Sequence, residues 1–177
     1  MTGEAPIYER DPEQWREYLA EGNRTQPRKR VAADVLIRDR DGNVLLVDPR
    51  YKPDWDIPGG MVEANEAPAD GARREIQEEL GISIALGSLL VVDWVPPHDP
   101  WDDSLVFVFD GGVLDEQGQE RIRLRDDEIA QFGFFPPAQA ANLLRNYVWH
   151  RTGAALRALP SNRVIYLHRG RSPDAQG

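Results

Sequence analysis

The segment from Gly60 to Ile82 constrains this chain most, because it combines carboxylates, arginines and glycines at spacings that suit a helix and a metal site. Residues three and four apart on a helix point to the same side, so Glu75, Glu78 and Glu79 converge on one patch. Crowded like charges are unfavourable unless a cation lies between them, and oxygen-rich sites suit Mg²⁺ or Mn²⁺. The segment therefore predicts a divalent metal site on a helix.

The sequence also marks where that helix starts and ends. Pro68 suits the first helical turn, where its missing N–H is harmless, and Gly81 suits a left-handed cap. Just ahead of the helix, residues 55–60 predict a short strand that enters a glycine loop, where backbone can approach a metal or phosphate closely. One helix face is apolar at helical spacing and is expected to pack on a sheet, through Ala69, Ala72, Ile76 and Leu80.

With Glu66 and Arg74 included, this segment resembles the Nudix box of the Nudix hydrolase family. That box reads Gly, five residues, Glu, seven residues, and then Arg-Glu-apolar-x-Glu-Glu-x-Gly-apolar. A helix rich in Glu and Arg is otherwise typical of a solvated face, so the upstream residues decide between the two interpretations. A chance match in a chain of this length is on the order of one in a million. Every specified position is filled, by Gly60, Glu66, Arg74, Glu75, Ile76, Glu78, Glu79, Gly81 and Ile82.

The resemblance, which covers residues 55–82 in detail, implies both a fold and a reaction. The fold is α/β, a Nudix-type α/β/α sandwich in which a mixed β-sheet lies between helices. The reaction is Mg²⁺-dependent hydrolysis, with Mn²⁺ as the other candidate cation, of a phosphoanhydride bond in a nucleoside diphosphate linked to a further group X. A nucleotide sugar, an ADP-ribose-like compound or a nucleoside triphosphate is the expected substrate.

The resemblance also implies which residues carry the reaction. Glu75, Glu78 and Glu79 are expected to be catalytic metal ligands, with the backbone carbonyl of Gly59 as a further ligand. The general base in the family is either a box glutamate or a carboxylate from a later loop. Glu128, in an acidic turn before a strand, is the candidate for that later carboxylate, and Glu75 is the fallback. The other interpretation of Glu128 is an ordinary solvated turn residue.

Further residues are expected to brace the site or to contact the substrate. Glu66 and Arg74 are expected to form a structural ion pair that holds the loop against the helix. Arg50 and Lys52 precede the glycine loop and are candidate phosphate ligands, although exposed basic residues often have no such role. Trp101 is a candidate to stack on a nucleobase, the alternative being that it covers the edge of the core.

Composition narrows the function further. The net charge of −9 argues against a broad nucleic-acid-binding surface, although a bound metal reverses the local sign where phosphates would bind. The absence of cysteine nearly removes an isopentenyl diphosphate isomerase, which shares the fold and uses a catalytic cysteine. The expected partner is a small phosphorylated, nucleotide-derived substrate, with no nucleic acid polymer and no membrane. The alternative function is a non-catalytic nucleotide-sensing module with a Nudix fold.

The chain divides into three parts. Residues 1–30 form an N-terminal extension, whose short helix at 11–21 ends at Gly22 and is available for a homodimer. Residues 31–169 form the Nudix hydrolase domain, and residues 170–177 a disordered tail. The chain has no apolar span for a bilayer and its start lacks the features of a signal peptide, so the cytoplasm is the expected compartment.

Within the domain the elements are expected to alternate between strands and helices. After the helix that starts at Pro68, a second helical region is expected from Pro137 to about Leu159, with Gly153 as its break. The strands are expected at 31–37 and 44–47, which form a hairpin, then at 83–95 with a turn near Gly87, 104–111, 119–124, 129–135 and 164–167.

Overall fold

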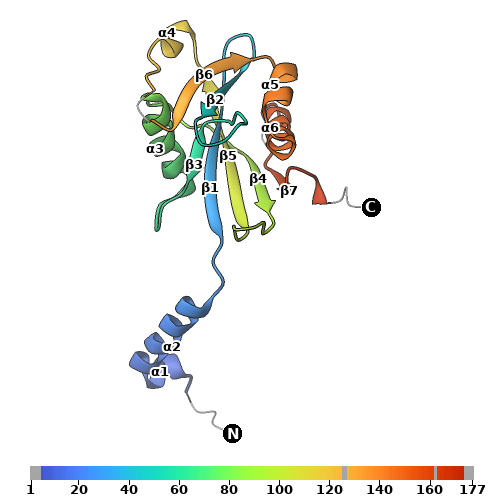
Figure 1. Cartoon of the computed structure of the whole chain (residues 1–177). Coiled ribbons are helices and arrows are strands. Elements are labelled where there is room, and N and C mark those ends of the chain that lie inside the picture. Colours follow the sequence, from blue (N-terminus) through green and yellow to red (C-terminus); the bar gives the residue numbers. More distant parts are fainter. Residues whose placement is uncertain (1–4, 125–126, 162, 174–177) are drawn as a thin grey trace.

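The protein is described by a computed structural model that covers residues 5–124, 127–161 and 163–173. In chain order its elements are α1 (Ile7–Arg10), α2 (Pro12–Thr25), β1 (Arg30–Arg38), β2 (Val44–Pro49), β3 (Gly59–Met61), α3 (Pro68–Leu80), β4 (Leu89–Val95), β5 (Ser104–Val113), α4 (Glu116–Gln119), β6 (Ile129–Phe135), α5 (Pro137–Leu143), α6 (Asn146–Ala158) and β7 (Ile165–His168). The strands form a sheet between two helical layers, with α3 over one face and α5 and α6 over the other (Figure 1).

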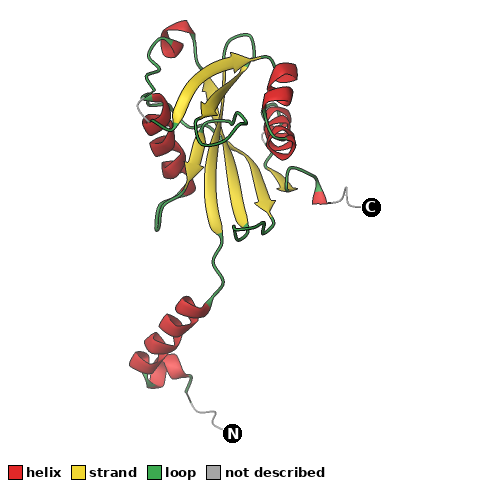
Figure 2. Cartoon of the chain, in the orientation of Figure 1, coloured by secondary structure: helices red, strands yellow, loops and turns green. Residues whose placement is uncertain are grey.

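The sheet contains both parallel and antiparallel pairs. Its strand order is β6-β2-β1-β5-β4-β7, and β3 pairs additionally with β1. The β1–β5 and β4–β7 pairs are parallel, and the others are antiparallel. Figure 2 shows how the strands fill the space between the helices. The mixed sheet with helices on both faces confirms the predicted α/β/α sandwich.

The strand β1 runs through the middle of the sheet, and its residues from Ala33 to Ile37 are buried. Successive side chains of a strand point to opposite faces. Leu36 accordingly packs in the core beneath α6, whereas Val35 packs in the core beneath α3. A strand covered on both faces reads as a nearly continuous apolar run. Asp34 is the one carboxylate in this run, and it lies beneath α6.

The helix α3 has the predicted bounds. Ala72, Ile76 and Leu80 are fully buried against the sheet, as their helical spacing requires. Gly81 ends the helix in the left-handed conformation, with φ at 67°, and its N–H donates to the carbonyl of Gln77 over 3.1 Å. This packing fixes which side of α3 is free to present carboxylates.

Two glycines do not interrupt helices where the sequence suggested. The helix α2 continues through Gly22, whose carbonyl accepts hydrogen bonds from the Gln26 N–H at 3.0 Å and the Thr25 hydroxyl at 3.3 Å. The helix α6 runs through Gly153, and the break lies at residues 144–145, between α5 and α6. A glycine costs a helix only about 1 kcal/mol, which packing and hydrogen bonds offset.

Two predicted strands are wrong in whole or part. The strand expected at 83–95 begins only at Leu89, because the preceding segment packs Ile84 and Leu86 on the core and reaches β5 first through the Gly87 N–H. Residues 119–124 are not a strand. Asp115 caps the short helix α4 by accepting a hydrogen bond from the Gly118 N–H, and the chain leaves that helix in turns. Apolar side chains that pack from a loop imitate the alternation of a strand.

The two ends of the chain differ in their contacts. The helices α1 and α2 extend away from the sheet in Figure 1, and none of their residues is buried. Gly170 and Arg171 lie in a turn after β7, whereas residues 174–177 of the predicted tail lie outside the described part of the chain. No helix among the described residues is long and apolar enough to cross a bilayer.

A buried ion network ties α6 to two strands. The Arg151 side chain of α6 donates to Asp93 of β4 over 2.9 Å and to Asp34 of β1 over 3.3 Å. All three residues are at most 9% exposed. A charge removed from water needs an opposite charge and hydrogen bonds nearby, and here one guanidinium serves two carboxylates.

Arg151→Met is therefore expected to lower the free energy of unfolding by about 3–5 kcal/mol, because it strands two buried carboxylates without their cation. The urea midpoint of the variant measures this loss. Arg157→Met, at an exposed position of the same helix, is the matched control and is expected to change stability by less than about 0.5 kcal/mol. Equal midpoints for the two variants would contradict a structural role for the network.

Candidate functional site

The site forms where α3 meets the glycines of β3. Gly59 has φ at 142°, and a Cβ there would lie 2.4 Å from the Ala33 carbonyl oxygen of the paired strand β1. A Cβ on Gly60 would lie 2.5 to 2.7 Å from the carboxylate of Glu75. Gly59 therefore requires glycine, because a side chain there would meet backbone, whereas a side chain at position 60 would displace the Glu75 carboxylate from the loop. The two glycines let a helix carboxylate lie directly on the backbone of the loop.

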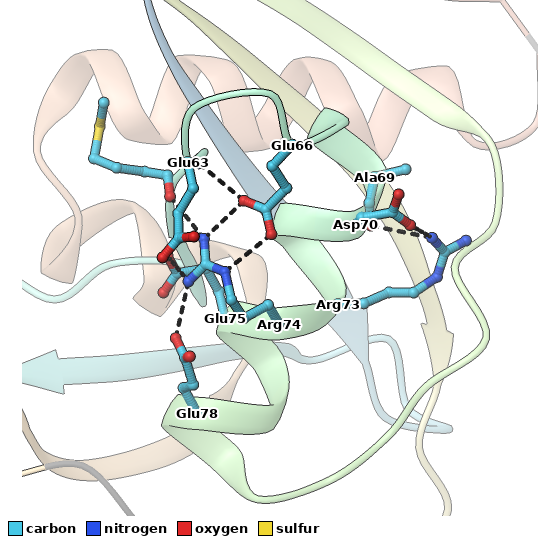
Figure 3. Close-up of polar contacts among 9 residues, drawn as sticks. Glu63, Glu66, Ala69, Asp70, Arg73, Arg74, Glu75 and Glu78 are labelled. Carbon is cyan, nitrogen blue, oxygen red and sulfur yellow. Dashed lines mark hydrogen bonds and ion pairs between the residues drawn. The ribbon is translucent and has the colours of Figure 1, made fainter.

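Arg74 gathers three glutamates on one side of this contact (Figure 3). Its Nε and Nη2 each donate to one oxygen of Glu66 at 3.0 Å, which is a bidentate pair. Its Nη1 donates to Glu75 and to Glu78, both at 2.9 Å. Nη2 also donates to the Met61 carbonyl of β3 at 2.9 Å. Arg74 thus fixes the start of the helix, the loop and two of the expected metal ligands relative to one another.

Glu79 is held separately, by the backbone of the glycine loop. Its carboxylate accepts a hydrogen bond from the Gly59 N–H at 3.0 Å, and no ion pair joins it to a cation among the described residues. Burial raises the pKa of Glu79 to about 8, and the nearby charge of Glu75 adds to the increase. Burial also raises the pKa of Glu75, against the opposing effect of Arg74. Negative charge is therefore in excess at this loop.

The same region includes a carboxylate from the sheet. Burial raises the pKa of Asp34 to about 7; the Arg151 guanidinium opposes this increase, and the charge of Asp56 reinforces it. Asp56 itself forms an ion pair with Lys52. For Lys52, burial works to lower the pKa, but the pairing with Asp56 outweighs it and the net direction is upward. Lys52 and Arg151 therefore neutralise only part of the negative charge of the carboxylates in this region.

The chemistry of this donor set fits a divalent cation. Glu75, Glu78 and Glu79 offer carboxylate oxygens, the ligands that Mg²⁺ and Mn²⁺ prefer, and a cation would stabilise the ionised forms that burial disfavours. As they lie, no three His, Asp or Glu side chains in the described ranges close round a common point. Two of the glutamates instead rest on Arg74, which keeps them beside the loop.

A cleft of about 430 Å³ opens beside the glycine loop, between β1, β5 and the start of α6. Gly59, Glu79, Lys52 and Trp101, which the sequence singled out, line it. Arg50, Glu75, Glu78 and Glu128 are not among its lining residues. The cleft is also lined by residues for which the sequence predicted no role, among them Arg30, Asp34, Tyr51, Asp56, His98, Tyr147 and Arg151.

Three residues that the sequence singled out, Arg50, Glu128 and Trp101, lie in loops next to strands. The Arg50 N–H donates to the Glu128 carbonyl over 2.7 Å where β2 and β6 meet, and both residues are exposed. Arg125 and Asp126 of the same acidic turn lie outside the described residues. Trp101 is 53% exposed, and the guanidinium carbon of Arg30 lies 4.3 Å from the centre of its ring. An aromatic face with a cation beside it is a suitable surface for a planar or anionic group.

Sequence reasoning missed two residues of this cleft, Asp34 and Arg151. Their signal was nevertheless present: each is a charged residue inside a segment that is otherwise buried and apolar. Such a residue needs a partner and often belongs to a site. Asp34 and Arg151 lie 117 positions apart in the chain, so their pairing becomes visible only in the fold.

Comparisons with known proteins give the same family. The sequence model of the NUDIX domain matches residues 28–156. Human diphosphoinositol polyphosphate phosphohydrolase 3-alpha is 35% identical over 114 residues, which are 64% of this chain and 66% of that protein. Diphosphoinositol polyphosphate phosphohydrolase 2 of Rattus norvegicus is 41% identical over 80 residues, 45% of this chain and 42% of that protein. The chain thus spans between about two fifths and two thirds of these relatives.

Among solved structures, that of a UDP-X diphosphatase superposes with a TM-score of 0.63. It covers 86% of this chain and 74% of its own, at 21% sequence identity. At this identity the likeness establishes the fold.

The raised pKa of Glu79 makes a prediction for protein stripped of divalent cations. Below pH 4.5, its ordinary pKa, the carboxyl is neutral in both folded and unfolded protein and costs nothing. Between pH 4.5 and about 8 the folded protein holds the proton more tightly, so rising pH destabilises it, fully so above about 8. Glu79→Gln is expected to remove this penalty and to gain on the order of a few kcal/mol at pH 9, each pKa unit being worth about 1.4 kcal/mol.

Thermal unfolding in EDTA at pH 4.5 and pH 9 measures this gain. The melting temperature of the Glu79→Gln variant should exceed that of the parent at pH 9 and match it at pH 4.5. Asp70→Asn, at an exposed position of α3, controls for loss of charge from the helix. A lower melting temperature for Glu79→Gln at pH 9 would show that the carboxylate is not under electrostatic strain.

Proposed function

Since the chain belongs to the NUDIX family, whose domain matches residues 28–156, we propose that it is a hydrolase that cleaves a phosphoanhydride bond with the help of Mg²⁺ or Mn²⁺. The proposed substrate is a small molecule that contains a diphosphate, such as a nucleoside diphosphate linked to a group X. Water attacks one phosphorus, and two phosphorylated products leave.

The proposal rests on one observation: the half-buried carboxylates of Glu75 and Glu79 lie on the glycine loop beside a cleft, with more negative charge than the basic residues there neutralise. In the core, Asp34 and Asp93 each have an ion-pair partner in Arg151. Glu79 at the glycine loop has a backbone N–H as its partner and no ion pair among the described residues, and burial raises its pKa, which is the electrostatic state of a site that accepts a cation from outside.

Glu75, Glu78 and Glu79 would hold the cation, with the carbonyl of Gly59 as a further ligand. A divalent cation held there would supply Lewis-acid chemistry, by activating a water for attack and by stabilising the negative charge that develops on phosphate. Arg74 contributes position: it keeps Glu75 and Glu78 next to the loop through hydrogen bonds of 2.9 Å. Its bidentate bond to Glu66 braces Arg74 in turn.

We assign the general base to Glu128, with Glu75 as the fallback. Glu128 is exposed at the start of β6 and lies next to Arg50, so its carboxylate is accessible to a water near the outer end of the site. Glu75 is half-buried against Gly60, and its carboxylate accepts a hydrogen bond from Arg74. A carboxylate held in this way is better suited to bind a metal than to act as a mobile base. A base must reach water and then release its proton, and the exposed position serves that better.

The lining of the cleft supports a nucleotide-derived substrate. Lys52 lies between Asp56 and the Tyr51 ring, and it supplies a positive charge next to the glycine loop for a phosphate. Trp101, with Arg30 stacked on it, offers a face for a base or another planar group X. The curated relatives are phosphohydrolases of diphosphoinositol polyphosphates by name, so an inositol carrying a diphosphate belongs in the substrate panel alongside nucleotides.

The test is hydrolysis of a substrate panel with Mg²⁺. Nucleotide sugars, ADP-ribose, nucleoside triphosphates and diphosphoinositol polyphosphates are scored for released phosphorylated products, and EDTA should abolish any turnover. Glu79→Gln is expected to lower kcat at least about 100-fold, because a lost ligand removes several kcal/mol of charge stabilisation. Asp70→Asn on the same helix should retain kcat. A blank panel together with tight nucleotide binding would favour the nucleotide-sensing module instead.

A second variant separates the base from the ligands. Glu128→Gln is expected to lower kcat by about 10²–10⁴-fold, as loss of a general base does, while Mn²⁺ affinity stays at the parent value. Glu75→Gln should weaken Mn²⁺ affinity as well. Calorimetric titration of Mn²⁺ alongside steady-state kinetics distinguishes the two patterns, and an unchanged kcat for Glu128→Gln would move the base to Glu75.

A further inference from the structure

A second cleft, of about 460 Å³, lies where the start of α6 faces β4 and the end of β7. Figure 1 shows these elements together at the edge of the sheet. Its lining contains two arginines and two histidines and no carboxylate, although the chain carries a net charge of −9. The lining residues are Trp94, Pro96, Asn146, Tyr147, His150, His168, Arg169 and Arg171.

The basic residues come from a tight turn with an unusual backbone. His168 and Arg171 exchange backbone hydrogen bonds of 2.8 and 3.1 Å, and the two residues between them both have positive φ, 49° at Arg169 and 77° at Gly170. Positive φ at both central positions defines a type I′ turn, which suits Asn-Gly or Gly-Gly. An arginine at the first position is strained, and such strain persists mainly where a function requires it.

Several contacts hold this turn rigidly in place. The Gly170 N–H donates to both carboxylate oxygens of Asp93 at 3.0 Å, and the Arg169 N–H donates to the Trp94 carbonyl at 2.9 Å. A Cβ on Gly170 would lie 2.5 Å from the Tyr147 carbonyl oxygen, so the turn packs directly on the first turn of α6. Asp93 is fully buried and bonded to Arg151. The turn is therefore anchored to the buried ion network.

The guanidiniums of Arg169 and Arg171 lie on this turn without a neutralising carboxylate among the described residues. Arg169 lies over the ring of Tyr147, with 5.7 Å between its guanidinium carbon and the ring centre. Within the described residues, neither Arg169 nor Arg171 forms an ion pair with a carboxylate. Lys52, Arg74 and other basic residues of the domain do have such partners. Two unneutralised guanidiniums on a rigid turn, with histidines beside them, match the geometry of phosphate recognition.

From this arrangement we propose that the second cleft is a binding site for a phosphate group, held by Arg169 and Arg171 and flanked by His150 and His168. The site is distinct from the glycine loop and needs no metal. Tyr147 lines both clefts, so the two adjoin. The phosphate therefore belongs either to a remote part of the substrate or to a separate small anion, and the chemistry of recognition is the same for both.

Binding is tested with inorganic pyrophosphate in EDTA, which removes the divalent cation that the first cleft is proposed to use for binding phosphate. The three histidines report its location by NMR: the ring signals of His150 and His168 should shift saturably, whereas His98, which lines the first cleft, should not. The variant Arg169→Gly/Arg171→Gln retains the turn, because glycine adopts positive φ freely. It is expected to weaken affinity at least about tenfold, since each charged hydrogen bond is worth that much or more.

The control variant Arg157→Ala/Arg163→Ala removes two arginine charges from exposed positions outside the second cleft, and it should retain the parent affinity for pyrophosphate. Equal affinity for both double variants, or a shift confined to His98, would overturn the proposal. This result does not depend on hydrolysis, so it stands apart from the proposed activity.

The source of the phosphate is distinguished by KM for a matched pair, ADP-ribose and its 2′-phosphate. If the second cleft serves the substrate, Arg169→Gly/Arg171→Gln raises KM for the phosphorylated member and leaves ADP-ribose unchanged. If it binds a separate anion, KM for both members is unaffected while pyrophosphate binding is still lost. Either pattern supports a phosphate site and assigns its ligand.

Discussion

Incomplete neutralisation of partly buried carboxylates is the constraint on which the site depends. Two arginines organise the acidic residues of this domain, and they do so differently. Arg151 lies between Asp34 and Asp93 in the core and forms an ion pair with each. Arg74 holds Glu66, Glu75 and Glu78 at the rim, and Glu79 keeps only a backbone N–H. The negative charge left over lies at the glycine loop, where a cation can enter.

The fold brings this charge to a cleft through a few close approaches. The apolar face of α3 buries Ala72, Ile76 and Leu80, which leaves the glutamates directed at β3. Gly59 and Gly60 admit the carboxylates because any side chain there would collide with them or with β1. From the opposite face of the sheet, α6 contributes Arg151 to the first cleft and Tyr147 to both clefts. The buried network therefore connects the rigid turn after β7 with the floor of the site.

Local patterns in the sequence were sufficient to predict much of the fold and the glutamates of the candidate site. Cap signals and apolar spacing gave α3 its correct bounds, because both depend on residues within a few turns. Local patterns failed at Gly22 and Gly153, where the helix continued, and at 119–124, where loop side chains imitated a strand. Asp34 and Arg151 were missed for a different reason: their partners are far away in the chain, and only the sheet brings them together.

The most direct test of a cation site at the glycine loop is anomalous scattering from crystals of the protein grown with Mn²⁺. We expect a peak within coordination distance, on the order of 2 Å, of carboxylate oxygens of Glu75 or Glu79 and near the Gly59 carbonyl. Glu78 should lie in the same coordination sphere or one water away. A crystal that binds Mn²⁺ only elsewhere, with Glu79 still on the Gly59 N–H, would contradict it.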